Sequence, residues 1–413
     1  MRLVTTLRVA GLAIAASLCV ASVVVSVDVT GSAAASTPPL PANDAFYAAP
    51  ANLDSYPNGA IVRFRAGNAA VAFVGFALGT TSWQLAFRSN DTQGHPIMAV
   101  TTILVPHGTY TGGAVLRPLV TYQVAEDSLG LQCAPSYSLQ TGANRLTNVE
   151  QSVMALALMR GYALNIPDYE GPNSAELAGV QDAHIILDSV RAAKSFTPAG
   201  LSPQTPTGLW GYSAAGMATA WAAELQPSYA PDLAIAGVAF GGAPYSLVNS
   251  FKRMDGGPFM SFVLTGLVGL MKAYPGWDVM SQFNPAGKAM VAAIDGTCIA
   301  DIGFSYPFRK LDDFTLARSA IDVPVNKAFL AAGSLGHFIP TVPLYTYFTP
   351  FDEAVPLEDS LTMIDKYCAG GARVVSSVNV LADHVIAAVT SAPGALDFLD
   401  ARFKGERLTG ACH

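Results

Sequence analysis

The chain has 413 residues, a length that suits one large α/β domain with a full hydrophobic core. Charged residues make up 13% and apolar residues 51% of it, a composition typical of a compact, alanine-rich globule. The formal net charge is −7, and no cluster of lysines and arginines follows the first residues. Nucleic acids and anionic membrane surfaces are therefore excluded as expected partners.

Residues 1–35 have the pattern of a secretory signal peptide. Arg2 and Arg8 precede an apolar run from Val9 to Val27, and the segment ends on the small residues Ala33–Ala35, an A-x-A cleavage site. The apolar run is longer than in most signal peptides, so an uncleaved anchor that retains the protein at the cell envelope is the alternative. We predict a secreted, extracellular protein.

Four cysteines follow the signal segment, whereas Cys19 lies within it. An even number of cysteines in an oxidising compartment predicts two disulfides, and the spacing leaves all three pairings open. These cysteines are Cys133, Cys298, Cys368 and Cys412. The chain contains no C-x-x-C or H-E-x-x-H pattern, so we assign no metal and no other cofactor.

The segment after the signal peptide begins with an arm and a hairpin. Residues 36–60 are rich in proline and predict an extended arm on the surface of the domain. Residues 80–89 and 95–106 are rich in aromatic and β-branched side chains and flank the polar stretch "NDTQG". This pattern predicts an antiparallel hairpin.

From residue 114 the pattern changes to short apolar runs that alternate with helical periods. We predict strands at 114–123, 162–167, 207–212 and 233–242, and helices at 149–160, 176–196 and 214–225. Such alternation indicates βαβ units that build a mainly parallel sheet with helices on both faces. Active sites in such sheets lie at the carboxyl ends of the strands.

Residues 243–306 interrupt the alternation and predict a helical insertion that forms a lid or cap. Within it, the glycine-punctuated apolar stretch Phe259–Leu270 suits an acyl-chain wall or a lid that contacts a lipid–water interface, with plain core as the alternative. The α/β pattern then resumes with a strand near 342–350, a helix at 357–371, a strand at 372–380, a loop at 381–384 and a last helix at 394–403. The predicted domain spans 61–413.

The stretch "GYSAAG" contains a candidate nucleophile, Ser213. A serine presented at the end of a strand needs small neighbours, because the turn into the next helix is tight. Gly211, Ala215 and Gly216 are small, and Tyr212 ends the predicted strand. The alternative role is a serine N-cap of the helix that follows.

The base and the acid are predicted from chain order, since on this fold they follow the nucleophile as acid and then histidine. His384 lies in the loop before the last helix, whereas His337 comes too early and His413 is the last residue. For the acid we choose Asp352 at the end of a predicted strand.

The alternative roles of these two residues are structural and not catalytic. His384 could be a solvent-facing loop histidine, and Asp352 could be a turn or cap carboxylate. Glu353 and Asp383 compete for the role of the acid, but we expect Glu353 to point away from Asp352 and Asp383 to diverge from the imidazole ring.

The oxyanion hole should combine the amide of Ala214 with a donor from the loop 123–128, for which we choose Asp127. Asp168 and Glu170 end another strand at the same edge of the sheet. They could shape the pocket or serve only in a turn.

With these segments in place, the chain resembles the secretory lipase family, to which the fungal lipases of the Candida lipase A type belong. The segments that carry the resemblance run in order from about Val120 to Cys412 and include "CAPSY", "IPDYEGP", "LWGYSAAGMATAW", "FDEAVP", "DKYCAGGARV" and "ADH". The family's catalytic serine, aspartate and histidine fall on Ser213, Asp352 and His384. The stretch "GYSAAG" departs from the family, which more often has a polar residue and a glycine after the serine, where this chain has Ala214 and Ala215.

The resemblance implies an α/β-hydrolase fold with a cap over an acyl tunnel, the disulfides Cys133–Cys298 and Cys368–Cys412, and hydrolysis of acyl esters such as lipids. We therefore predict a lipase or esterase that forms an acyl-enzyme. The rival functions are an acyltransferase or peptidase with the same triad, or a non-catalytic surface binding protein on the hydrolase scaffold.

Overall fold

The computed structural model describes residues 37–73, 75–303, 305–408 and 412. The predicted signal peptide, Cys19 and His413 lie outside the described residues. Within the described part of the chain, no helix combines the length and the apolar character needed to cross a lipid bilayer.

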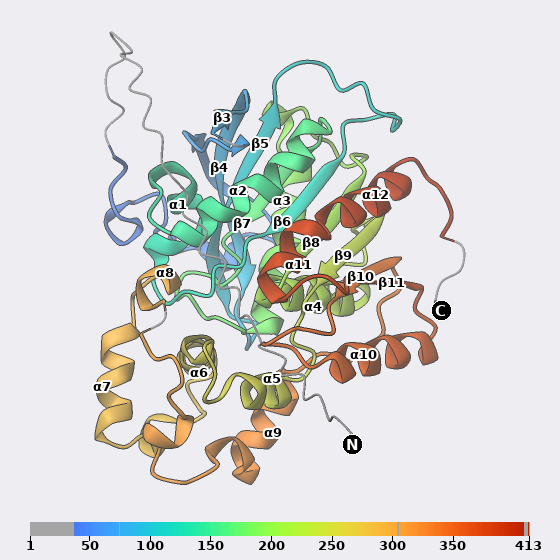
Figure 1. Cartoon of the computed structure of the whole chain (residues 1–413). Helices are drawn as coiled ribbons and strands as arrows, with labels where there is room; N and C mark the ends of the chain where they lie inside the picture. The colour runs from blue at the N-terminus through green and yellow to red at the C-terminus, as the bar shows by residue number, and fades with distance from the viewer. Residues whose placement is uncertain (1–36, 74, 304, 409–411, 413) are drawn as a thin grey trace, which may run out of the picture. The chain divides into compact units, whose positions relative to one another are not determined.

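A nine-stranded sheet forms the centre of the domain, in the order β1-β4-β5-β7-β6-β8-β9-β10-β11 (Figure 1). The six strands from β7 to β11 in this order run parallel, and β1, β4 and β5 extend the sheet with antiparallel pairs. The strands are β1 Ile61–Ala66, β4 Thr80–Asn90, β5 Pro96–Pro106, β6 Leu119–Gln123, β7 Ala163–Pro167, β8 Thr207–Tyr212, β9 Gly237–Gly241, β10 Leu344–Phe348 and β11 Val374–Val378; β2 Ala72–Phe73 pairs separately with β3 Phe76–Ala77.

The predicted hairpin is confirmed as β4 and β5, which pair from Thr80 with Pro106 to Asn90 with Pro96. Two strands begin much later than predicted. The first of them, β6, begins only at Leu119, because Pro118 precedes it and Val115 is fully exposed. The second, β9, begins at Gly237 instead of residue 233.

Helices cover both faces of the sheet. One face packs against α3 and α4, and the other against α2 and α12, so Leu209 and Trp210, neighbours on β8, enter different hydrophobic clusters. The helices are α1 Pro135–Thr141, α2 Arg145–Met159, α3 Gly179–Ser195, α4 Ala214–Tyr229, α5 Leu247–Met254, α6 Met260–Ala273, α7 Pro285–Ile294, α8 Ile299–Ile302, α9 Pro324–Gly333, α10 Leu357–Ala369, α11 His384–Thr390 and α12 Ala392–Phe403. Every residue of β6, β7, β8 and β9 is buried, as a covered parallel sheet requires.

The helical segment between β9 and β10 holds α5 to α9, which lie together on one side of the sheet (Figure 1). It continues beyond residue 306, the predicted end of the lid, because α9 still belongs to it. Most of α6 is buried, with Val263, Leu264 and Leu270 fully enclosed. Most of the stretch Phe259–Leu270 therefore packs into the core and exposes little apolar surface, whereas its beginning, Phe259 and Phe262, lines a cavity as predicted for a wall.

The N-terminal arm differs from the extended segment that we predicted. It forms two short 3₁₀ helices, Pro41–Asn43 and Leu53–Ser55, and buries Phe46 and Leu53 in a cluster with three residues of β4 and β5. Burial of these two side chains fixes the arm to the sheet, and an ion pair of 2.7 Å between Asp44 and Arg65 adds to the attachment.

Candidate active site

Ser213 lies in the turn between β8 and α4, in a backbone conformation that non-glycine residues rarely adopt (φ 60°). Its small neighbours are required by the tight packing of the turn. A Cβ atom on Gly211 would lie 2.5 Å from the carbonyl oxygen of Ala215, and one on Gly216 would lie 2.6 Å from that of Gly241. The methyl group of Ala215 is fully buried and is accommodated. The side chain of Ser213 makes no capping hydrogen bond, which removes the N-cap alternative.

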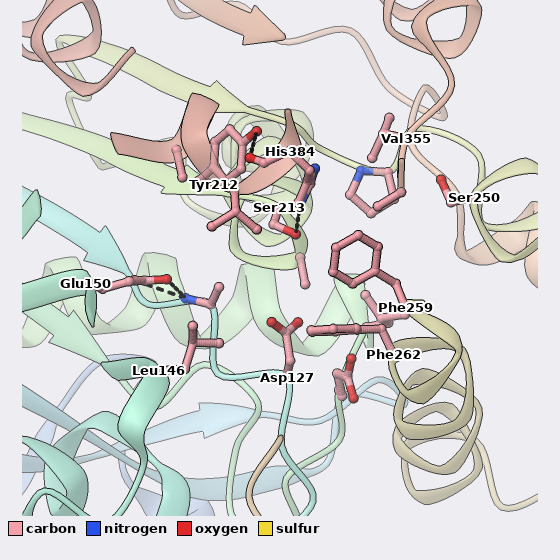
Figure 2. A pocket seen from close by; sticks show the side chains of 18 of the residues that line it. Asp127, Leu146, Glu150, Tyr212, Ser213, Ser250, Phe259, Phe262, Val355 and His384 are labelled. Carbon is pink, nitrogen blue, oxygen red and sulfur yellow. Dashed lines mark hydrogen bonds between the residues drawn. The ribbon is translucent and has the colours of Figure 1, made fainter. Parts of the chain in front are cut away.

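The predicted base and acid both lie beside Ser213 (Figure 2). His384 Nε2 is 2.9 Å from Ser213 Oγ, and His384 Nδ1 is 2.8 Å from Asp352 Oδ2. The other oxygen of Asp352 accepts the amides of Ala354 at 2.9 Å and Val355 at 2.7 Å. The turn role considered for Asp352 is therefore present as well, and it orients the carboxylate toward the imidazole.

His384 was expected in a loop but opens the short helix α11. The reason is Asp383, whose Oδ1 accepts the amide of Ile386 at 2.7 Å and caps the helix. The expectation that Asp383 diverges from the imidazole ring is therefore correct. The expectation for Glu353 was wrong, because its Oε2 accepts the backbone amide of His384 at 3.0 Å.

Burial and charge act in opposite directions on the pKa of His384. Burial favours the neutral ring and lowers the pKa, whereas the hydrogen bond and the negative charge of Asp352 favour the imidazolium, and the net shift is upward. Glu353 and Asp127 add to this upward shift. The site thus stabilises a positive charge on the imidazole, as proton transfer from a serine requires. His337 is not part of the site, since its ring stacks on Trp221.

The two predicted oxyanion donors, Ala214 and Asp127, both line the cavity in front of Ser213. Ala214 is the first residue of α4, so its amide has no acceptor within the helix. Asp127 has a positive φ of 46°. Burial raises the pKa of its carboxyl group to about 6, although the nearby His384 lowers it.

The loop that carries Asp127 is attached to the helical segment between β9 and β10. Ser128 Oγ accepts the amide of Ile299 at 3.0 Å, the amide of Leu129 donates to the carbonyl oxygen of Thr297 at 3.0 Å, and Lys272 Nζ donates to the carbonyl oxygen of Leu129 at 2.7 Å. The disulfide between Cys133 and Cys298 joins the same two regions, with a Cα–Cα distance of 5.4 Å.

The second disulfide, between Cys368 and Cys412, joins α10 to the C-terminal segment beside β11. The structure therefore contains both pairings that the family resemblance implies.

A cavity of about 1170 Å³, which includes the space at its open mouth, extends from Ser213. Its walls are predominantly apolar and come from α2, α5, α6 and α11. The side chains that form them include Leu146, Val149, Val153, Leu247, Phe251, Met254, Phe259, Phe262, Val385 and Val389. Figure 2 shows Phe259 and Phe262 projecting from α6 toward the serine. A cavity with these apolar walls suits an acyl chain.

Asp168 and Glu170 do not line this cavity. Asp168 instead accepts two hydrogen bonds from Ser136, from the amide at 2.8 Å and from Oγ at 2.5 Å, and so attaches α1 to the end of β7. The carboxyl group of Glu170 is buried without a hydrogen-bond partner among the described residues. The side chain of Asp168 thus joins two elements of the fold, and it neither lines the cavity at Ser213 nor closes a turn.

Two acidic residues at the cavity were not found from the sequence, Glu150 and Glu176. A signal for Glu150 did exist: it is flanked at helical spacing by Leu146 and Val153, so a charged residue lies on the apolar face of α2. Among the residues that the structure describes, no group of three or more histidines, cysteines or acids is arranged to hold a metal ion.

Comparison with known proteins places these features in a family. The sequence model of the family described as secretory lipase matches residues 139–411. The chain belongs to the secretory lipase family. It is therefore an ester hydrolase of the lipase or esterase type, and the family predicted from the sequence is confirmed.

Individual relatives agree with this assignment over most of their length. The chain is 32% identical to the secreted triacylglycerol lipase LIP1 of Malassezia furfur over 90% of this chain and 77% of that protein. It is also 32% identical to a protein of Mycobacterium tuberculosis named "Probable inactive lipase MT1628", over 90% of this chain and 84% of the relative.

Among solved structures, Candida antarctica lipase A superposes with a TM-score of 0.81 and 28% identity, over 91% of this chain and 89% of that one. The predicted α/β-hydrolase fold is thereby confirmed.

Proposed function

We propose that this chain is a secreted hydrolase of acyl esters that acts through Ser213, His384 and Asp352 and forms an acyl-enzyme. The proposal depends above all on one observation, the hydrogen-bonded series from Ser213 Oγ through His384 to Asp352. This series lies at an apolar cavity, so the proposed substrate is an ester whose apolar acyl chain lies in that cavity.

The proposed reaction begins with attack of Ser213 Oγ on the acyl carbon of the ester while His384 Nε2 accepts the serine proton. Asp352 stabilises the imidazolium, and the amides of Ala214 and Asp127 donate hydrogen bonds to the carbonyl oxygen as it becomes negative. His384 then protonates the leaving alcohol, which departs and leaves the acyl group on the serine. Water then attacks the acyl carbon while His384 accepts its proton. His384 returns this proton to Ser213 Oγ as the bond to the acyl group breaks, and the acid is released.

Residues 1–35 lie outside the described part of the chain, and their pattern supports export through a signal peptide. Similarity to a secreted lipase of Malassezia furfur agrees with an extracellular place of action.

One relative is named as a probable inactive lipase, so activity must be tested directly. The serine, the histidine and the acid of the proposed reaction are all present in this chain, and His384 lies within hydrogen-bonding distance of both Ser213 and Asp352. We therefore expect this chain to be active.

The test is hydrolysis of p-nitrophenyl esters from acetyl to palmitoyl by the secreted protein and by Ser213→Ala. We expect a loss of about 10⁴-fold or more in kcat, because the nucleophile is removed. A matched control is Ser228→Ala on the same helix, whose hydroxyl bonds only to the carbonyl oxygen of Leu225. Equal activity of Ser213→Ala and the parent would overturn the proposal, and products formed with an added alcohol would reveal acyl transfer.

A further inference from the structure

Glu150 lies on α2 and directs its carboxyl group at the loop that follows β6 (Figure 2). The amide of Ala125 donates to Glu150 Oε1 at 3.0 Å and approaches Oε2 at 3.3 Å. The hydroxyl of Tyr122, on β6, donates to Oε2 at 3.1 Å. One side chain of α2 thus holds both the end of the strand and the beginning of the loop.

This contact lies two residues before Asp127, the proposed second oxyanion donor. The amide of Ala125 is occupied by Glu150 and is not available to an oxyanion, which leaves the amide of Asp127 as the donor that the proposed function assigns to this loop. The positive φ of Asp127 is part of that turn, and a strained turn persists only where its surroundings hold it.

The other attachments of the loop are made mainly to the helical segment between β9 and β10, as described for Ser128, Leu129 and Lys272. On the side of α2 the remaining contact is Asn144 Nδ2, at 3.5 Å from the carbonyl oxygen of Glu126, a long distance for a hydrogen bond. Glu150 is therefore the principal attachment of the loop to α2.

Glu150 is a half-buried side chain, and its carboxyl group is held by these hydrogen bonds and not by a positive partner. Burial raises its pKa to about 8, although the hydrogen bonds from Ala125 and Tyr122 act against this. Whether or not the carboxyl group carries a proton, it keeps an oxygen that accepts the amide of Ala125. Glutamine has the same shape and the same acceptor, so Glu150→Gln is the conservative replacement.

We propose that Glu150 is a positioning residue for the oxyanion hole: it holds the amide of Ala125 and thereby directs the amide of Asp127 at the ester carbonyl. This inference rests on the proposed function. It assigns to Glu150 a role in the rate of acyl transfer to the serine, which a residue that only lined the cavity would not have.

The test compares Glu150→Gln with Glu150→Met in the full-length secreted protein. Methionine fills the space but offers no acceptor for the amide. The substrates are a p-nitrophenyl ester and the matching thionoester, whose C=S sulfur accepts hydrogen bonds weakly. Rates are expressed per active site, as titrated with a serine-directed phosphonate.

We expect Glu150→Met to lower kcat for the ester about 10- to 100-fold, with KM within about threefold. The reason is that the displaced amide of Asp127 stabilises the oxyanion of the transition state and contributes little to binding of the ester. Hydrolysis of the thionoester should fall much less. Glu150→Gln should remain within about threefold of the parent on both substrates.

A matched control is Glu224→Gln with Glu224→Met. Glu224 is a buried glutamate whose carboxyl group also accepts backbone amides, those of Gly336, His337 and Phe338, away from the cavity. Loss of this acceptor in Glu224→Met should lower Tm without changing the ratio of ester to thionoester rates. If Glu150→Met does not fold, Glu150→Ala removes the same acceptor.

Three results would each overturn the positioning role: a ratio of ester to thionoester rates that is unchanged in Glu150→Met, a change in KM alone, or an equal decrease of kcat in Glu150→Gln and Glu150→Met. Failure of the proposed function has a different result, because Ser213→Ala would then retain the activity of the parent. In that case the role of Glu150 would fall with it.

Discussion

The hydroxyl of Tyr212 donates a 2.7 Å hydrogen bond to the backbone carbonyl oxygen of His384. The residue before the candidate nucleophile thus holds the backbone of the candidate base, 172 positions later in the chain. The two rings also lie 5.2 Å apart between centroids. Asp352 bonds to the ring of His384 and Glu353 accepts its backbone amide. Together with the bond from Tyr212, these contacts fix both the backbone and the ring of His384.

Removal of the Tyr212 hydroxyl should therefore impair catalysis more than stability. We expect Tyr212→Phe to lower kcat several-fold with little change in KM, since the aromatic ring stays and one hydrogen bond of about 1 kcal/mol is lost. Steady-state kinetics and thermal unfolding measure the two effects. Tyr345→Phe, at a ring that stacks on Phe398, is the control. An unchanged kcat in Tyr212→Phe would show that the imidazole does not need this support.

Asp352→Asn should abolish most of the activity while the fold remains. The side-chain oxygen of asparagine can still accept hydrogen bonds from the backbone amides of Ala354 and Val355. The side chain carries no negative charge, so it cannot stabilise a protonated His384. We expect a decrease in kcat of about 10³- to 10⁴-fold. The measurement is kcat with p-nitrophenyl esters, together with circular dichroism to verify folding.

The rival acid provides the comparison for this variant. Asp383→Asn should retain nearly full activity, because asparagine is also a good N-cap and Asp383 contacts the amide of Ile386. If Asp383→Asn were as inactive as Asp352→Asn, the identity of the acid would have to be revised.

The main features of this site follow from local sequence patterns. The small residues around Ser213 and the strand before it predicted the turn, because only small side chains fit where a Cβ on Gly211 would meet the carbonyl of Ala215. Chain order then selected His384 and Asp352. The order of nucleophile, acid and base along a parallel sheet requires no knowledge of distant contacts.

What the sequence could not predict depends on where loops lie in space. Glu353 was expected to point away, but alternation of side chains applies within a strand and β10 has ended at Phe348. The tertiary structure decides that Glu150 is half-buried and that Glu170 is buried, whereas a single charged residue in a sequence usually indicates exposure to solvent.

The pH dependence of activity should reflect His384, which accepts a proton only in its neutral form. Because its pKa is raised, kcat/KM should increase with pH through a midpoint above 6.5. The carboxylate of Asp127 contributes to the raised pKa, so Asp127→Asn should move the midpoint to lower pH. Rate profiles between pH 4 and 9 measure this, and a shift to higher pH in the variant would contradict the assignment.

The pH dependence of stability should be dominated by buried acids. Burial and mutual repulsion raise the pKa values of Glu126, Glu170 and Glu176 well above the usual range, and burial does the same for Asp182. The native state therefore binds more protons than the unfolded chain, and the free energy of unfolding falls as pH rises above the unfolded pKa of about 4. Thermal unfolding should give a higher Tm near pH 5 than near pH 9.

Glu170→Gln tests this explanation, since both oxygens of Glu170 are buried without a partner among the described residues. The variant should gain stability relative to the parent at pH 9 and lose that advantage near pH 4. Asp232→Asn should behave in the opposite sense, because a hydrogen bond from Arg191 lowers the pKa of Asp232. An equal pH dependence of Tm in Glu170→Gln and the parent would contradict the role of this acid.

Removal of the two disulfides should have unequal effects on stability and on catalysis. The bond between Cys133 and Cys298 spans 165 positions, and that between Cys368 and Cys412 spans 44. Chain entropy predicts stabilisation of about 5 and about 4 kcal/mol, respectively, so both double alanine variants should unfold at lower temperature, the first more so.

Catalysis should distinguish the two variants more sharply. Only the bond between Cys133 and Cys298 ties the region of Asp127 to α8, where Ile299 also contacts Ser128. We therefore expect the variant that lacks it to lose kcat several-fold at a temperature where it is still folded, whereas loss of the bond between Cys368 and Cys412 should leave kcat unchanged. Kinetics at 20 °C on both variants, with active sites titrated, decide between this outcome and a purely stabilising role, which would leave kcat the same in both.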